Sequence, residues 1–243
     1  MNTLKSILLS LLITASITSC FNNTTVHPSN NITILNKEIS DYEGIDVSSG
    51  FVVDVEYSST DESIEIEAND NLHQYIEVEK VNNLLRIKIQ NGVSIRGNAT
   101  LKVHIVTNDV LNYFAASGAS TISLTDDISS DDVTISLSGA SKFNGTINSN
   151  TLDIDLSGAS NADLQGSTES LSLDATGAST LSDFDMVVQD KANIQLSGAS
   201  NANLTINGTI DVSASGASNL RYKGIGTIAS IDTSGASQVI KVN

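Results

Sequence analysis

The sequence predicts an all-β protein: a right-handed parallel β-helix, or solenoid, closed at its N-terminal end by a β-rich cap. The first observation is a quartet of small residues, SGAS or a close variant, which begins at positions 117, 138, 157, 176, 197, 215 and 234. The intervals between these positions are 21, 19, 19, 21, 18 and 19, and a fixed period of this size is typical of a solenoid. The second is that Ile, Leu and Val alternate with polar residues, as in strands with one buried face.

Aligning the repeats shows how one coil is built. The residues one and three positions before each quartet are mostly apolar, and the second residue after it often is too. The positions before successive quartets are Ile135 and Leu137, Ile154 and Leu156, Leu173 and Ala175, Ile194 and Leu196, Val212 and Ala214, and Ile231 and Thr233. Each coil therefore enters a corner along one strand and leaves it along another. Stacking at ~4.8 Å would pair every strand with its neighbours above and below.

The quartets are interpreted as the corners of the solenoid. Their second residue is always glycine, as expected where the backbone needs a positive φ or passes too close for a Cβ. These structural corner positions are Gly118, Gly139, Gly158, Gly177, Gly198, Gly216 and Gly235. The third residue is always Ala, whose methyl group is expected to point into the corner, while Ser and Thr hydroxyls can bond along the stack or to the turn backbone. The alternative is a flat Ser/Ala ladder that recognises a repeating ligand, such as a glycan or an ice surface.

Residues 1–19 are predicted to be a lipoprotein signal peptide. Lys5 precedes an apolar run over residues 7–17, which is shorter than the ~20 residues of a membrane-spanning helix. The run stops at Cys20, the only cysteine, and SITSC resembles a bacterial lipobox with Ile17 in place of the more usual Leu. This resemblance implies lipidation of Cys20 and anchoring to a membrane through its acyl chains. The alternative is ordinary signal cleavage beside an incidental cysteine.

The rest of the chain divides into three further segments. Residues 20–36 are polar and Asn/Thr-rich and are predicted to be a flexible tether. Residues 37–110 contain longer, more charged alternating strands, with a short helical turn expected at 69–75, and are predicted to cap the repeat coils of residues 111–243. No comparable segment follows the last quartet, so we expect an open strand edge at the C-terminal end, available to a partner or to a second copy.

Charge and motifs disfavour several functional classes. The net charge is −16, which disfavours nucleic acid and anionic lipid surfaces as partners. His27, His73 and His104 are isolated, and no phosphate-binding loop, dinucleotide fingerprint or nucleophile elbow occurs. We therefore expect no enzymatic activity and no cofactor.

An acidic face is the one candidate for a metal site. Asp155 and Asp174 occupy equivalent positions in consecutive coils, and stacked carboxylates can bind a divalent cation. Gln195 and Ser213 interrupt this series, so we expect a solvated acidic surface and no bound metal. Basic residues, which β-helix polysaccharide lyases place beside such acids, are sparse over residues 115–243: Lys142, Lys191, Arg221, Lys223 and Lys241.

Three features together resemble a known family: YEGIDVSSGFVVDVEYS, IEIEANDNLHQYIEVEKVNNLLRIKIQNGVSIRG and the iterated SGAS. They resemble the auto-transporter adhesins with a head GIN domain, secreted proteins found largely in Bacteroidetes-type bacteria. The resemblance covers roughly residues 38–240 and implies a right-handed β-helix exported to the cell envelope. It carries over no binding residue, so the ligand-binding residues are unknown.

The expected function is that of a non-enzymatic lipoprotein, anchored to the outer membrane through Cys20, whose β-helix binds a glycan, matrix or cell-surface partner. The first alternative is a periplasmic structural or accessory lipoprotein that binds another envelope protein, with the open C-terminal edge as the contact. The second is a carbohydrate-active enzyme built on a β-helix. FNNTTV, which follows Cys20, has no acidic run of the kind that resembles a surface-export signal. Exposure on the cell surface and location in the periplasm are therefore both retained, with a slight preference for the periplasm.

Overall fold

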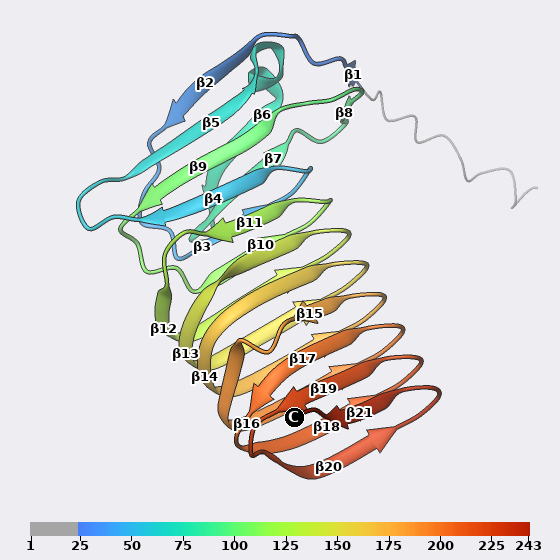
Figure 1. Cartoon of the computed structure of the whole chain (residues 1–243). Helices are drawn as coiled ribbons and strands as arrows, with labels where there is room; N and C mark the ends of the chain where they lie inside the picture. Colours follow the sequence, from blue (N-terminus) through green and yellow to red (C-terminus); the bar gives the residue numbers. More distant parts are fainter. Residues whose placement is uncertain (1–23) are drawn as a thin grey trace, which may run out of the picture.

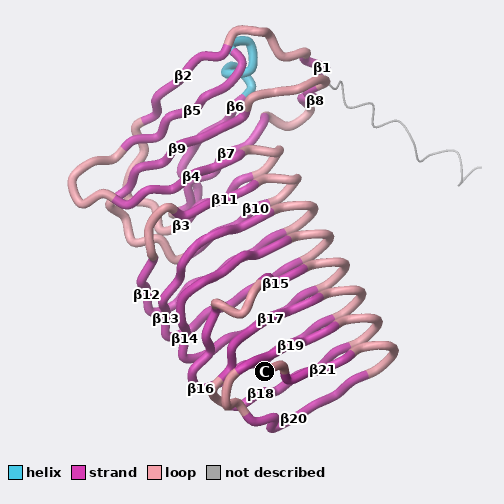
Figure 2. The backbone as a smooth tube through the Cα atoms, in the orientation of Figure 1, coloured by secondary structure: helices cyan, strands magenta, loops and turns pink. Residues whose placement is uncertain are grey.

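The computed structural model describes residues 24–243 as a β-solenoid of about seven turns (Figure 1). Strands account for 63% of the protein and helix for 3%, so the predicted all-β class is confirmed. Successive coils stack side by side, and the pink loops of Figure 2 line up along one edge of the stack. Within the described residues, no helix is long and apolar enough to cross a membrane.

The repeat region is built from strands that pair in parallel from coil to coil. They are β10 (Tyr113–Ala116), β11 (Thr121–Leu124), β12 (Ile128–Leu137), β13 (Lys142–Leu156), β14 (Asn161–Ala175), β15 (Thr180–Ser182), β16 (Met186–Leu196), β17 (Asn201–Ile206), β18 (Thr209–Ala214), β19 (Asn219–Lys223), β20 (Thr227–Thr233) and β21 (Gln238–Lys241). Leu137 pairs with Leu156, and Leu156 pairs with Ala175. This is the register that the alignment of the repeats predicts.

The stack continues beyond the repeats, in an order that differs from the order of the chain. The coil of β3 (Gly44–Val47) and β4 (Val52–Tyr57) pairs in parallel with β10 and β11. Outside it, β7 (Leu84–Ile89) and β9 (Leu101–Thr107) pair in parallel with β3 and β4. The boundary predicted at residue 110 is therefore wrong, because part of the 37–110 segment forms solenoid coils.

Antiparallel strands close this end of the stack. β5 (Ser63–Asn69) runs along β9, β6 (Ile76–Val81) runs along β7, and β2 (Ile32–Lys37) runs along β5. A 3₁₀ turn, η1 (Asp70–Tyr75), connects β5 to β6, where the sequence predicts a helical turn. These elements form the cap of the solenoid.

Residues 24–36 belong to the cap, so the predicted tether is wrong for this stretch. β1 (Thr24–Val26) pairs with β8 (Val93–Ile95), and β2 adds a strand to the sheet. Hydrogen bonds hold this stretch in place: the Asn69 side-chain amide donates to the Ser29 carbonyl oxygen at 2.6 Å, and the Asn31 side-chain amide donates to the Asp70 carboxylate at 2.9 Å. The predicted signal peptide and Cys20 lie outside the described residues.

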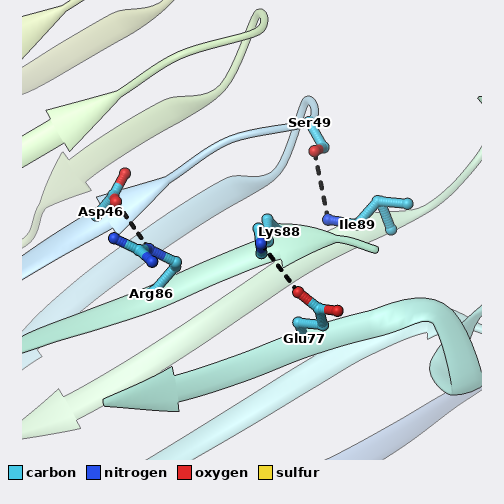
Figure 3. A network of polar contacts seen from close by, with 6 residues as sticks. All are labelled: Asp46, Ser49, Glu77, Arg86, Lys88 and Ile89. Carbon is cyan, nitrogen blue, oxygen red and sulfur yellow. Dashed lines mark hydrogen bonds and ion pairs between the residues drawn. The ribbon is translucent and has the colours of Figure 1, made fainter. Parts of the chain in front are cut away.

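Ion pairs join β7 to β3 of the next coil and to β6 of the cap (Figure 3). Arg86 Nε lies 3.1 Å from Asp46 Oδ2, and Lys88 Nζ lies 3.0 Å from Glu77 Oε2. Both pairs are partly exposed, and such pairs contribute only ~0–1 kcal/mol to stability. The backbone ladders and the apolar interior therefore hold the cap to the solenoid.

Candidate functional site

Each SGAS quartet forms a turn at one corner of a coil. The second-position glycines of the seven quartets have φ between +62° and +77°. They are also crowded: a Cβ on Gly177 would lie 2.4 Å from the carbonyl oxygen of Gly158 in the preceding coil. That oxygen accepts a hydrogen bond from the Ala178 amide at 2.7 Å, so it is fixed in place. Glycine is therefore required here both for its conformation and for its lack of a side chain.

The fourth residue of the quartet, not the third, fills the corner. Ala178 is exposed, whereas Ser179 is fully buried, and the same holds in the other repeat turns up to residue 218. The prediction that the Ala methyl group points inward is therefore wrong. The reason is a hydrogen bond: the Ser179 hydroxyl donates to the Thr176 carbonyl oxygen at 2.7 Å, which an inward methyl group could not satisfy.

The buried hydroxyls form a ladder inside the protein. Ser141, Ser200 and Ser218 each donate to the carbonyl oxygen of the first residue of their own quartet, at 2.7–2.8 Å. The hydroxyls of Ser160 and Ser179 lie 3.3 Å apart, which links consecutive coils. These hydroxyls close the turns from within and are out of reach of a ligand, while Gly and Ala form the outer ridge.

The acidic residues singled out in the sequence lie side by side on the outer surface. Asp155 of β13 is in register with Asp174 of β14, and Gln195 and Ser213 continue the row. Desolvation, and then the negative charges of Asp174 and Asp153, raise the pKa of Asp155 above its ordinary value. Among residues 24–243, no group of three or more His, Cys, Asp or Glu is placed to hold a metal ion.

We expect Asp155→Asn to increase the free energy of unfolding at pH 7, because it removes a charge that its neighbours repel. The gain should stay below ~1 kcal/mol, since the carboxylates are exposed. Because the pKa is raised in the folded state, the charge destabilises the protein above that pKa and has no effect below the ordinary value of 3.8. Urea unfolding at pH 7 and pH 3 should therefore show the gain only at pH 7.

The matched control for this prediction is Asp232→Asn, because the in-register neighbour of Asp232 is the uncharged Ser213. Its gain at pH 7 should be smaller. An equal gain in the two variants would contradict repulsion between the stacked acids.

A polar groove of about 690 Å³ lies on another side of the solenoid. Its floor is formed by three neighbouring strands, on which Ser129 of β12, Asn148 of β13 and Ser167 of β14 lie in register. Val110 and Asn112, from the segment that connects β9 to β10, complete its lining. The groove therefore lies beside the segment through which the chain enters the first repeat coil.

Hydrogen bonds fix the amides of this groove. The Asn148 side-chain oxygen accepts from both the backbone amide and the hydroxyl of Ser167, at 3.2 Å each. The Asn150 amide donates to the Asp131 carboxylate at 2.9 Å. The groove thus presents oriented hydroxyl, amide and carboxylate groups, an arrangement suited to a ligand with many hydrogen-bonding groups.

A smaller hollow of about 220 Å³ adjoins the groove and shares Val110 and Ser129 with it. Tyr57 lines this hollow and is 41% exposed. Its hydroxyl donates to the Asn108 carbonyl oxygen at 2.9 Å, and its backbone amide donates to the Asp126 carboxylate at 2.9 Å. An aromatic ring is therefore held beside the polar groove.

None of the groove residues stands out in the sequence, although the repeat intervals carry a signal for them. The interval from position 117 to position 138 is two residues longer than the next one. The extra residues lie between Ser123 and Ile128, because the partners of these two residues in the next coil, Asn144 and Ile147, are two residues closer together in the sequence. This insertion makes a bulge, and its last residue, Asp127, lines the smaller hollow. An irregular interval between the quartets thus marks the place where the surface of the solenoid departs from its regular repeat.

Comparisons with known proteins agree with this architecture. The model of the family described as "Putative auto-transporter adhesin, head GIN domain" matches residues 41–226. A solved putative adhesin from Bacteroides fragilis is 19% identical, with a TM-score of 0.79 over 89% of this chain and 100% of that one. A Parabacteroides distasonis protein titled a putative lipid binding protein is 16% identical, with a TM-score of 0.72 over 90% and 100% of the two chains. No curated protein matches the chain.

Proposed function

The chain belongs to the putative auto-transporter adhesin family with a head GIN domain, and we propose that it is a non-enzymatic envelope lipoprotein that binds a glycan, matrix or cell-surface partner. The observation that carries the proposal is the polar groove beside an exposed aromatic ring, on a scaffold that is otherwise a regular stack of strands. Solved proteins of the same fold are titled putative adhesins, which supports the same function.

The proposal includes an anchor at Cys20 in the outer membrane. SITSC supports it through its similarity to a lipobox, and two or more acyl chains give stable membrane attachment where one does not. The structural neighbours from Bacteroides fragilis and Parabacteroides distasonis are titled putative adhesins, which supports a place in the cell envelope.

Protease shaving of intact cells tests this proposal. Cells expressing the full chain are treated with protease and blotted beside a lysed sample. We expect the wild-type chain to be degraded on intact cells and the Cys20→Ser variant to leave the membrane fraction. Protection of the wild type until lysis would contradict the adhesin function, and membrane retention of Cys20→Ser would contradict the anchor.

A periplasmic accessory role is the second candidate, and the C-terminal coil favours it. Ile228 and Ile231 are 41% and 52% exposed, although their partners in the preceding coil, Ile210 and Val212, are buried. All residues of β20 are exposed. An apolar strand edge of this kind is suited to contact with another protein, and protection of the protein in the shaving experiment would make this role the leading one.

A further inference from the structure

We propose that the groove over β12, β13 and β14 binds an uncharged glycan, with the Tyr57 ring as a stacking surface at one end. This inference rests on the proposed function and assigns a site and a ligand class to it. The residues that carry it are Ser129, Asp131, Asn148, Asn150 and Tyr57.

The spacing of the polar groups suits a polymer of hydroxyl-bearing units. Ser129, Asn148 and Ser167 are in register on adjacent strands, so one polar side chain follows another every ~4.8 Å along the groove. Amides both donate and accept hydrogen bonds, and carboxylates accept them, so the row complements hydroxyl groups.

The groove is organised before a ligand arrives. Ser167 fixes the orientation of the Asn148 amide, and Asp131 fixes that of Asn150. Side chains that are already ordered lose less conformational entropy on binding, which favours affinity for a ligand held by many weak contacts.

The adjoining hollow supplies an apolar surface. The Tyr57 ring is exposed while its hydroxyl is engaged with the Asn108 carbonyl oxygen, and Val110 is 60% exposed beside it. Sugars have apolar C–H faces as well as hydroxyl groups. A rigid aromatic ring next to oriented polar groups fits both parts of such a ligand.

The charge of the site determines the class of glycan. Asp131 and Asp132 line the groove, and among the described residues that line it there is no Lys or Arg. The whole chain carries −16, so a sulfated or uronic-acid polymer would be repelled. Since the recognition described above depends on neutral hydroxyls, binding should change little with ionic strength.

The test uses the full chain carrying Cys20→Ser, purified without lipid, and immobilised mannan, dextran, xylan and chitin oligosaccharides, with heparin and chitosan as charged probes. We expect binding to at least one uncharged polymer, changing less than twofold between low and high salt. Asn150→Ala and Tyr57→Ala should each weaken it at least tenfold. Two control variants should bind as strongly as the chain that carries Cys20→Ser alone. They are Tyr57→Phe, which keeps the ring, and Asn193→Ala, on the exposed surface of β16. Thermal unfolding of each variant checks that the fold is intact.

Several outcomes would overturn the proposal. Unchanged binding by folded Asn150→Ala and Tyr57→Ala would place the glycan elsewhere, while leaving the adhesin function standing. Binding to heparin alone, or salt-sensitive binding to chitosan alone, would overturn the ligand class, as would failure to bind any uncharged polymer. The adhesin function itself is tested separately, because protection of the wild-type chain from protease on intact cells would contradict it.

Discussion

Gly177→Ala is expected to lower the free energy of unfolding by roughly 2–5 kcal/mol, from a conformational and a steric cost. Gly177 has φ +76°, a conformation that costs an L-residue ~1–2 kcal/mol. In addition, the new Cβ would lie 2.4 Å from the Gly158 carbonyl oxygen, which is bonded to the Ala178 amide. Relieving this overlap requires the two coils to separate at the corner, which adds an overpacking cost of ~1–3 kcal/mol. Urea unfolding followed by circular dichroism measures the difference.

The neighbouring alanine provides the control. Ala178 is exposed at the same turn, so Ala178→Ser should change stability by no more than ~0.5 kcal/mol. If the two substitutions had equal effects, the steric account of the corner would be wrong.

Phe143→Ala is expected to cost ~3–5 kcal/mol, the usual range for removing a buried aromatic side chain. Phe143 is fully buried on β13, and its ring centroid lies 5.2 Å from that of Phe114. The substitution would leave a void in a core that elsewhere consists mainly of aliphatic side chains. Urea unfolding of the purified chain measures the loss.

Phe184→Ala is the matched comparison, because Phe184 is only partly buried and lies outside the stacked core. Lys223 Nζ lies 4.5 Å from its ring centroid, a contact that contributes ~0.5–1 kcal/mol at exposed sites. Its removal should therefore cost much less than that of Phe143. A larger loss for Phe184 would show that the segment between β15 and β16 contributes more stability than the Phe143 core position.

The coil itself could be predicted from the sequence because its cause is local and repeated. The same corner recurs at a nearly constant interval, and alternation on either side of it decides which residues face inward. The resulting alignment gives the observed register, in which Ile135 lies over Ile154 and Ile154 over Leu173. Family membership follows from motifs in the non-repeated part as well as from the repeats.

The features that depend on long-range pairing could not be predicted in this way. β3 pairs with β10 although Gly44 and its partner Tyr113 are far apart in the chain, and no period connects them. Ser179 replaces Ala178 at the corner interior because of a hydrogen bond within the turn, which composition does not reveal. The groove and its hollow need Tyr57, Val110 and Asn150, which come from three separate parts of the chain.

If Cys20 carries the proposed lipid anchor, the early start of β1 limits how far the protein can stand from the membrane. Thr24 is already part of the sheet, and only three residues separate it from Cys20. A chain spans at most ~3.6 Å per residue, so a lipid on Cys20 would hold β1 within about 14 Å of the point of attachment. The part of the cap that contains β1 would then lie next to the bilayer. A partner that binds this part of the cap would therefore have to come close to the membrane surface.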